Sequence, residues 1–318
     1  GRGEPGGHIT AKYCGALLGG AVGDGLGAPF EGHAGPVPLR RLAVVEREPV
    51  GLRHTDDTAM TIALAESLLE VGDVDEDHLA ATLARRWKRE PGRGYASGAA
   101  TLFSRLGAGE ARQDVAPSLF GGDGSLGNGA AMRVAPVALL AGGDPHTAAW
   151  LGRRTARVTH THPLGIDGAA VQAAAVAIAL GQQPSERVDA EQFIGILTAE
   201  AHEPELVLKL HTVLDLLRCS NPRVVASRLG AGVTAPEAVA AAIWSFLRHA
   251  GSYRAVVRGA IRLGGDTDTV ASMAGALAGA HLGEHAIPAS WRHRAEAADE
   301  LLALALRFVA LAPGPTAG

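Results

Sequence analysis

The sequence predicts an all-α protein, folded as a single compact orthogonal bundle of roughly a dozen helices. Apolar residues recur at three- and four-residue spacings in several long segments, and β-branched runs are as short as the one near Val44. No repeat of fixed period and no linker divides the 318 residues. We therefore expect one domain over residues 9–312, with loose tails at 1–8 and 313–318.

The expected helices follow one another along the chain. Gly15, Gly19 and Gly23 recur every fourth residue, which favours the close-packing face of a first helix. Gly25 and Gly27 would end that helix and place Glu31 on a loop. Later helices are expected over four segments with helical apolar spacing or high alanine content: 56–71, 167–181, 235–251 and 269–283. The last of these carries Gly or Ala at every third or fourth position, which suits tight helix contacts.

Composition excludes several classes of protein. The formal net charge of −4 gives no long-range attraction to nucleic acid or to an anionic membrane. Two cysteines, Cys14 and Cys219, rule out a disulfide scaffold and suit a reducing compartment. The start, GRGEPGG, lacks the apolar core of a signal peptide, and no stretch approaches about 20 uninterrupted apolar residues. We expect a cytoplasmic monomer that binds neither membrane nor nucleic acid directly.

Four aspartates stand in two similar motifs, each at the start of a predicted helix. Asp56 and Asp57 belong to HTDDTAM, and Asp266 and Asp268 belong to GGDTDTVAS. Asp and Thr are favoured at helix N-termini, because their oxygens accept from unpaired N–H groups and their charge suits the helix dipole. In an extended segment, residues two apart point the same way, so Asp266 and Asp268 can present their carboxylates together. Either motif alone is compatible with simple capping.

Both motifs together indicate a metal site if the two helix starts meet. Each carboxylate pair about 4 Å apart costs about 4 kcal/mol at an effective dielectric of 20, more than the roughly 1 kcal/mol that a helix dipole returns. Bound cations would neutralise such a cluster, and oxygen ligands select Mg²⁺, Mn²⁺ or Ca²⁺. Two ions about 3.5–4 Å apart would use the four carboxylates and two threonine hydroxyls.

Three further motifs leave alternatives open. Residues 23–28 match a G-x-G-x-x-A dinucleotide fingerprint, but the strand that such a fingerprint needs is not predicted before it. His160 and His162 form the H-x-H pair of barrel amidohydrolases, here leading into an Ala-rich helix. The glycine-dense segment 120–133 is either a plain loop with a core Phe120 or an anion-binding nest of backbone N–H groups.

Six motifs, in order, resemble those of the ADP-ribosylglycohydrolase family, from about Thr10 to Trp291: GGAVGDGLGAPFE, HTDDTAM, RGYASGAATLF, GDGSLGNGAAMR, VTHTHPLG and GGDTDTVASMAGALAG. This resemblance implies an all-α fold with two Mg²⁺ (or Mn²⁺) ions. The implied metal ligands are Thr55, Asp56, Asp57, Asp266, Asp268 and Thr269. The implied catalytic residues are Glu31, Asp57 and Asp268. The implied substrate-binding residues are Gly94, Tyr95, Gly98, Phe120, Gly124, Ser125, Leu126, Gly127, Asn128 and His160.

The resemblance also implies the roles of the substrate-binding residues. Gly124, Ser125 and Gly127 would hold a diphosphate, Asn128 would contact ribose or fix the loop, Phe120 would stack on adenine, and His160 would contact ADP-ribose, with His162 structural. Two positions depart from the family pattern. Ala96 stands where a glycine is expected, which narrows the phosphate-side loop, and Leu126 stands where a tyrosine is expected, which loses a stacking ring.

The segment RGYASG and the glycine-dense loop are most similar to one branch of the family. That branch cleaves ADP-ribose from serine, O-acetyl-ADP-ribose and poly(ADP-ribose). The arginine-directed, dinitrogenase-reductase-activating branch tends to have an aspartate where this chain has Arg93. The implied reaction is hydrolysis of the C1″ glycosidic bond of ADP-ribose attached to proteins or small molecules, with Glu31 exchanging a proton with the leaving group or the water. The alternatives are arginine-directed hydrolysis and a non-catalytic ADP-ribose-binding protein.

Overall fold

The computed structural model describes residues 5–122 and 124–312, which form α-helices and no β-strand. The helices are α1 (Pro5–Gly27), α2 (Leu39–Arg47), α3 (Asp56–Val71), α4 (Glu76–Arg89), α5 (Ser97–Gly107), α6 (Arg112–Ser118), α7 (Ala135–Leu140), α8 (Pro145–Ala156), α9 (Pro163–Gly181), α10 (Ala190–Glu200), α11 (Pro204–Asp215), α12 (Pro222–Leu229), α13 (Ala235–His249), α14 (Tyr253–Arg262), α15 (Thr267–Leu282), α16 (Ala289–Arg294) and α17 (Ala298–Leu311). Many of the helices begin with a proline in the first turn or a capping side chain at the N-terminus, and α3, α12 and α15 end at a glycine. Short 3₁₀ helices span Ala28–Phe30, Phe120–Gly122 and Glu284–Ala286.

The all-α prediction is confirmed, with more helices than the dozen expected because several are only two turns long or less. The short β-branched run near Val44 lies in α2, whose buried residues are Leu42 and Glu46, while Val44 itself is exposed. The expected tail at residues 1–8 overlaps α1, which already begins at Pro5. Residues 1–4 and the expected tail at 313–318 lie outside the described residues.

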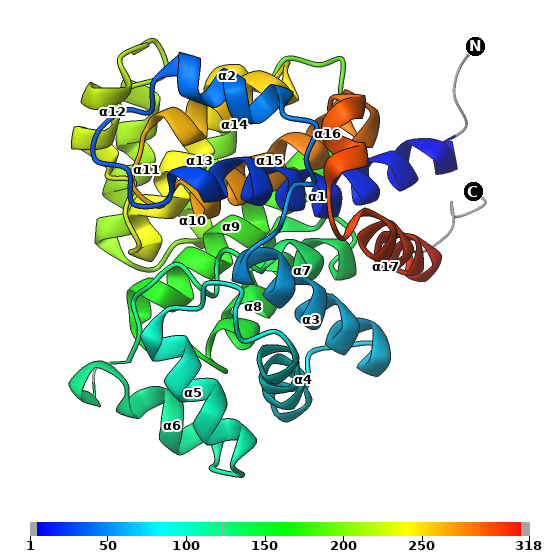
Figure 1. The fold of residues 1–318 in the computed structure, drawn as a ribbon, viewed down its shortest axis with the longest axis vertical. Helices are drawn as coiled ribbons and strands as arrows, with labels where there is room; N and C mark the ends of the chain where they lie inside the picture. The colour runs from blue at the N-terminus through cyan, green and yellow to red at the C-terminus, as the bar shows by residue number, and fades with distance from the viewer. Residues whose placement is uncertain (1–4, 123, 313–318) are drawn as a thin grey trace.

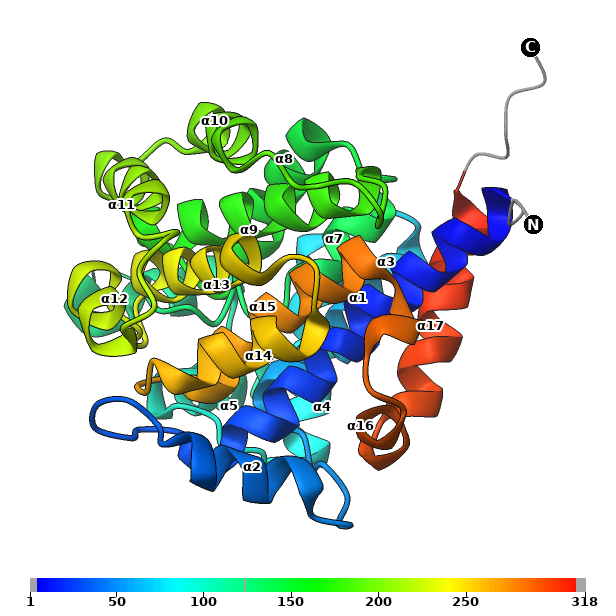
Figure 2. The ribbon, with the colours of Figure 1, turned by 90° about the horizontal axis from the view of Figure 1, so that it is seen from above.

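Helices α1 and α15 pack against each other at the centre of the fold, where Figures 1 and 2 show them side by side. A Cβ added to Gly19 would lie 2.4 Å from the carbonyl oxygen of Gly275, and one added to Gly15 would lie 2.2 Å from that of Gly279. The two backbones are therefore closer than any side chain permits. Since the pairing runs in opposite directions, the end of α1 meets the start of α15.

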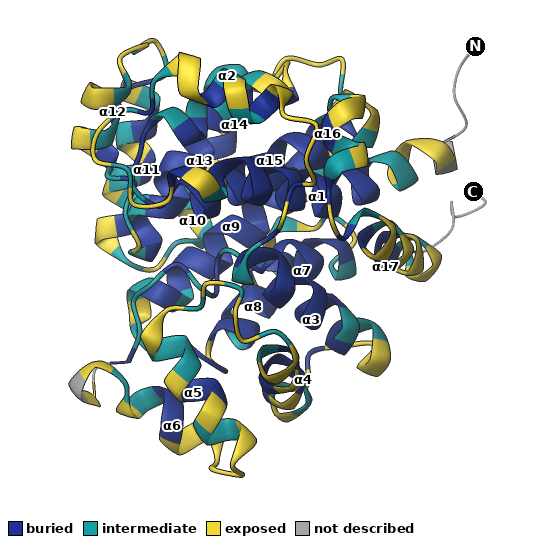
Figure 3. Cartoon of the chain, viewed as in Figure 1, coloured by how far each residue is buried: buried dark blue, intermediate teal, exposed yellow. Residues whose placement is uncertain are grey.

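The remaining core surrounds this pair. Buried apolar side chains form one cluster that extends from Tyr13 in α1 to Phe308 in α17, and Figure 3 shows α9, α13 and α15 as largely buried helices. By length and composition α9 could cross a membrane, but 83% of its apolar window is buried inside the protein, as in a core helix. The sequence-based expectation that no apolar stretch is long enough to span a membrane is therefore corrected for α9, which is long enough but is a core helix.

Candidate metal centre and substrate cavity

Three helix ends bring the acidic motifs together. Antiparallel packing places the end of α1 beside the start of α15, where Thr267 Oγ1 donates to the carbonyl oxygen of Gly27 at 2.8 Å. The first turn of α3 joins them through the Thr269 hydroxyl, which donates to Asp57 Oδ2 at 3.0 Å. One carboxylate oxygen from each of Asp24, Asp57 and Asp268 lies within 4.8 Å of the others. A second group of the same tightness contains Glu31, Asp266 and Asp268.

Capping consumes few of these oxygens. Thr55 is the N-cap of α3 and accepts from the N–H of Asp57 at 3.3 Å, so it is Thr55 and not an aspartate that caps this helix. Asp266 holds the N-cap position of α15 but makes no capping bond; it accepts from Asn128 Nδ2 at 2.6 Å. Asp268 lies in the first turn of α15, so the predicted extended segment is wrong, although the two carboxylates still meet.

The electrostatics of the cluster are unfavourable for a metal-free, ionised state. Burial, followed by the negative charge of Asp24, raises the pKa of Asp56 to about 8. Burial and the neighbouring Asp266 raise the pKa of Asp268 to about 10, and burial and Asp268 raise the pKa of Asp57 well above its ordinary value. Burial and then Asp266 raise the pKa of Glu31.

These residues fit a hard divalent cation. Asp268 Oδ1 is buried and has no hydrogen-bond partner, which is costly for a carboxylate oxygen unless a ligand completes it. Every candidate donor in the cluster is a carboxylate or hydroxyl oxygen, the set preferred by Mg²⁺, Mn²⁺ and Ca²⁺. Asp24 was not among the predicted site residues, although a carboxylate between two glycines in an otherwise apolar helix is a signal that could have identified it.

Most carboxylates of the cluster line a cavity of about 460 Å³, within the range of small-molecule sites. Of the predicted metal and catalytic residues, Thr55 alone does not line it; its hydroxyl contacts Asp24 at 2.7 Å and Asp268 at 3.3 Å. All the predicted substrate-binding residues line the cavity: Gly94, Tyr95, Gly98, Phe120, Gly124, Ser125, Leu126, Gly127, Asn128 and His160. Tertiary structure therefore brings residues from all six sequence motifs to the lining of one cavity.

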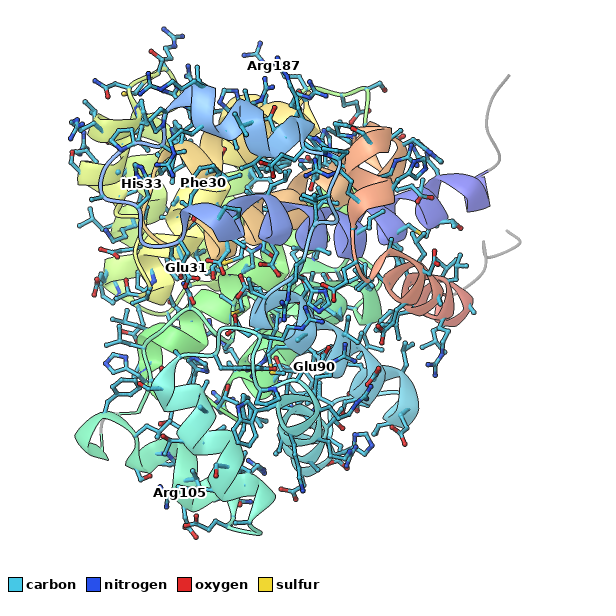
Figure 4. All side chains as sticks on the ribbon, in the orientation of Figure 1. Phe30, Glu31, His33, Glu90, Arg105 and Arg187 are labelled. Carbon is cyan, nitrogen blue, oxygen red and sulfur yellow. The ribbon has the colours of Figure 1, made fainter. Side chains whose placement is uncertain are left out.

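Glu31 reaches the cavity from the loop after α1. In Figure 4 it lies below Phe30 and His33, on the side of the cyan and green helices. The loop is held to the residues before α15, because the N–H of Gly32 donates to the Gly265 carbonyl at 2.8 Å and the N–H of Gly265 donates to that of His33 at 3.1 Å. The carboxylate of Glu31 itself is exposed, so it is free to meet a ligand.

The glycine-dense loop has less donor capacity than the sequence suggests. The N–H of Gly124 donates to the Leu119 carbonyl at 3.0 Å, and that of Gly127 donates to Ser125 Oγ at 3.2 Å. The N–H of Asn128 is also bonded, to the Val233 carbonyl at 2.8 Å. A diphosphate held by Gly124 and Gly127, as predicted, would have to compete with these internal partners.

Phe120 stands at the mouth of the cavity. Its side chain is 65% exposed, and its φ of 54° is the one positive value at a non-glycine position among the described residues. Such a conformation is strained and persists where the surroundings impose it, often at functional sites. A Cβ on Gly98 would come within 3.3 Å of the Phe120 ring, so glycine there leaves room for the ring.

The two histidines of the H-x-H pair separate. His160 is buried in the cavity wall, where burial and the nearby charge of Arg133 lower its pKa to about 3 and keep the ring neutral. His162 lies outside the cavity lining and caps α9, its Nδ1 accepting from the N–H of Leu164 at 3.1 Å. With no strand in the described chain either, the barrel amidohydrolase interpretation is wrong.

Two basic residues, Arg133 and Arg93, have positions that the sequence did not predict. Arg133, which sequence reasoning missed, is buried in the cavity wall and donates to the Thr155 carbonyl at 2.8 Å. Arg93 does not line the cavity; its guanidinium pairs with Glu296 at 2.7 Å and Glu90 at 2.9 Å. Its carbonyl accepts from the N–H of Asp56 at 2.8 Å. Arg93 thus supports the backbone at the start of α3 and does not face this cavity.

Fold and cavity together define an all-α protein with an oxygen-rich cation site beside a ligand-sized cavity. A family model described as ADP-ribosylglycohydrolase matches residues 7–317, and the chain belongs to this family. The chain is 35% identical to ADP-ribosylhydrolase ARH3 of Danio rerio, covering 94% of this chain and 90% of that protein. It is 34% identical to ADP-ribosylhydrolase ARH3 of Homo sapiens, covering 91% and 90%.

A solved structure, ADP-ribosylglycohydrolase-related protein complex, is similar in fold, with a TM-score of 0.75, 29% identity and coverage of 96% of this chain and 100% of that one. The family and these relatives make the chain a glycosidic-bond hydrolase. The dinucleotide-binding interpretation of residues 23–28 is wrong, because they span the end of α1 and the start of a 3₁₀ helix, and the described residues before them, from Pro5 on, are helical.

Proposed function

We propose that the protein hydrolyses the C1″ glycosidic bond of ADP-ribose attached to serine, to an O-acetyl group or to further ADP-ribose. One observation carries this proposal: the buried carboxylate cluster and the Phe120–Asn128 loop line the same cavity. This cavity can hold the polar sugar of a ligand at the cluster and its aromatic base at Phe120. The similarity to the two ADP-ribosylhydrolases supports this choice.

Two Mg²⁺ or Mn²⁺ ions would be held by Thr55, Asp56, Asp57, Asp266, Asp268 and Thr269, and would supply Lewis-acid chemistry at the ribose hydroxyls and a water molecule. Glu31, exposed beside the cluster, is placed to exchange a proton with the leaving group or the water. Burial raises the pKa of Glu31, which moves it toward the working pH, where a catalytic acid or base works best. Asn128 fixes the orientation of Asp266 through its amide.

The test compares a serine-ADP-ribosylated peptide with an arginine-ADP-ribosylated one, each with Mg²⁺ and with EDTA. Metal-dependent release of ADP-ribose from the serine peptide alone is the expected result. Release from the arginine peptide would favour the other branch, and binding of ADP-ribose without release from serine, arginine or O-acetyl conjugates would indicate a non-catalytic reader. The position of Arg93, turned away from the cavity, removes one argument that separated the two branches.

We also propose that the protein acts as a cytoplasmic monomer without direct nucleic-acid contacts. Both cysteines are free thiols, which supports the cytoplasmic location. The net charge of −4 supports the lack of direct nucleic-acid contacts. Size-exclusion chromatography with light scattering would test the monomer.

A further inference from the structure

Asp24 is a buried carboxylate that the proposed mechanism does not use. It is 0% exposed and lies in the last turns of α1, between Gly23 and Gly25. A Cβ on Gly23 would lie 2.2 Å from the carbonyl oxygen of Ala271 in α15. A Cβ on Gly25 would lie 2.8 Å from Leu52 Cβ. The two glycines therefore let α1 approach both α15 and the segment before α3. Asp24 lies between them, where α1, α15 and that segment meet.

Both oxygens of Asp24 are used by the start of α3. Oδ1 accepts from Thr55 Oγ1 at 2.7 Å. Oδ2 accepts from the N–H of Thr55 at 2.9 Å, from the N–H of Thr58 at 3.3 Å and from Thr58 Oγ1 at 2.7 Å. A carboxylate with four donors has little capacity left to bind a cation directly, although its oxygen lies close to those of Asp57 and Asp268.

The contact with Thr55 has a direct consequence for the metal site. A threonine hydroxyl has one hydrogen and two lone pairs. When its hydrogen points to Asp24, one lone pair of Thr55 Oγ1 accepts from the N–H of Asp57 at 3.3 Å and the other remains for a ligand. Asp268 Oδ2 lies 3.3 Å from the same hydroxyl oxygen. We propose that Asp24 is a positioning residue, which fixes the Thr55 hydroxyl as an oxygen ligand for a divalent cation. This rests on the metal dependence in the proposed function.

The test uses Mn²⁺ alone, with the free ion measured by electron paramagnetic resonance, so that it does not depend on turnover. Asp24→Asn keeps the shape but replaces one acceptor oxygen with a donor. We expect its Mn²⁺ Kd to rise about 10- to 100-fold, the usual effect of losing a residue that orients a metal ligand. Thr55→Val should also weaken binding. Adding Asp24→Asn to Thr55→Val should cost nothing more, because the two act through one hydroxyl.

Asp167→Asn is the matched control. Asp167 is equally buried, accepts from Arg153 and from the N–H groups of His202 and Glu203, and lies outside the cavity lining. It should lower the melting temperature and leave the Mn²⁺ Kd unchanged. If Asp24→Asn does not fold, Gly25→Ala provides a second variant, since its methyl would push Leu52 and thereby separate Asp24 from Thr55.

The positioning role would be overturned if Asp24→Asn bound Mn²⁺ as tightly as wild type, or if Gly25→Ala did so where that variant is needed. It would also be overturned if the losses of Asp24→Asn and Thr55→Val added fully in the double variant. If the wild-type protein itself bound no Mn²⁺, the metal dependence of the proposed function would fail as well. If the wild-type protein binds and Asp24→Asn binds equally, only the role of Asp24 fails.

Discussion

Thr55 Oγ1 lies 3.3 Å from Asp268 Oδ2, although 213 positions separate the two residues in the chain. This contact joins the start of α3 to the first turn of α15. The other oxygen of Asp268, Oδ1, is buried without a partner. Asp268 is thus both the link between the two acidic motifs and the member with an open coordination position.

Asp268→Asn should therefore abolish metal binding and turnover. We expect the Mn²⁺ Kd to rise by more than about 100-fold, beyond the range for a merely orienting residue. In EDTA the same variant should melt at a higher temperature than wild type, because one member of a buried like-charged cluster is removed. Isothermal titration and thermal melts measure both effects. The exposed Asp215→Asn should change neither, and metal-dependent turnover in Asp268→Asn would refute its role.

Stability of the metal-free protein should fall as the pH rises. A carboxyl whose folded pKa exceeds its unfolded pKa stabilises the fold in its protonated form. That contribution is complete below the unfolded pKa near 4 and is lost as the pH rises through the folded pKa, about 8 for Asp56. In EDTA the melting temperature should drop between about pH 4 and 8, and the increase on adding Mg²⁺ should grow over that range. A flat profile in EDTA would contradict the raised pKa values.

Glu31→Gln should separate binding from chemistry. The amide keeps the size of the side chain but cannot exchange a proton, so we expect kcat to fall about 10²- to 10⁴-fold. The Kd for ADP-ribose, measured by calorimetry, should stay close to that of wild type. Glu110→Gln, at an exposed site paired with Arg105, is the control. A normal kcat in Glu31→Gln would show that another group moves the proton.

Leu126→Tyr should strengthen ADP-ribose binding. Leu126 lines the same cavity as Phe120, and a tyrosine there would add a ring for stacking, worth about 0.5–1.5 kcal/mol beyond its buried area. We expect the Kd to fall roughly 2- to 10-fold, while Leu126→Met should leave it unchanged. Weaker binding by the tyrosine variant would mean that adenine does not lie against this residue.

Gly275→Ala should destabilise the fold by about 1–3 kcal/mol or more, because the new Cβ would lie 2.4 Å from the carbonyl oxygen of Gly19. Urea unfolding would measure this loss. Gly195→Ala, in α10 with open space around it, should instead stabilise by about 0.5–1 kcal/mol. Equal effects of the two substitutions would mean that α1 and α15 are not in backbone contact.

The sequence by itself determined the local structure and the chemical candidates. Three- and four-residue apolar spacing is set within one helix, so α3, α13 and α15 could be predicted close to their observed bounds. The glycine face of α1 was likewise visible as a four-residue repeat. The paired acidic motifs indicated metal chemistry because adjacent carboxylates are costly without a cation.

Only the tertiary structure decided which of these groups meet and which are already used. The position of Asp24 against Thr55, the turn of Arg93 toward Glu296 and the internal bonds of Gly124 and Gly127 all join separate segments or depend on loop conformation. Local periodicity carries no record of such contacts. They arise partly because glycine-to-glycine packing brings α1 against α15, and that approach places Asp24 beside Asp268.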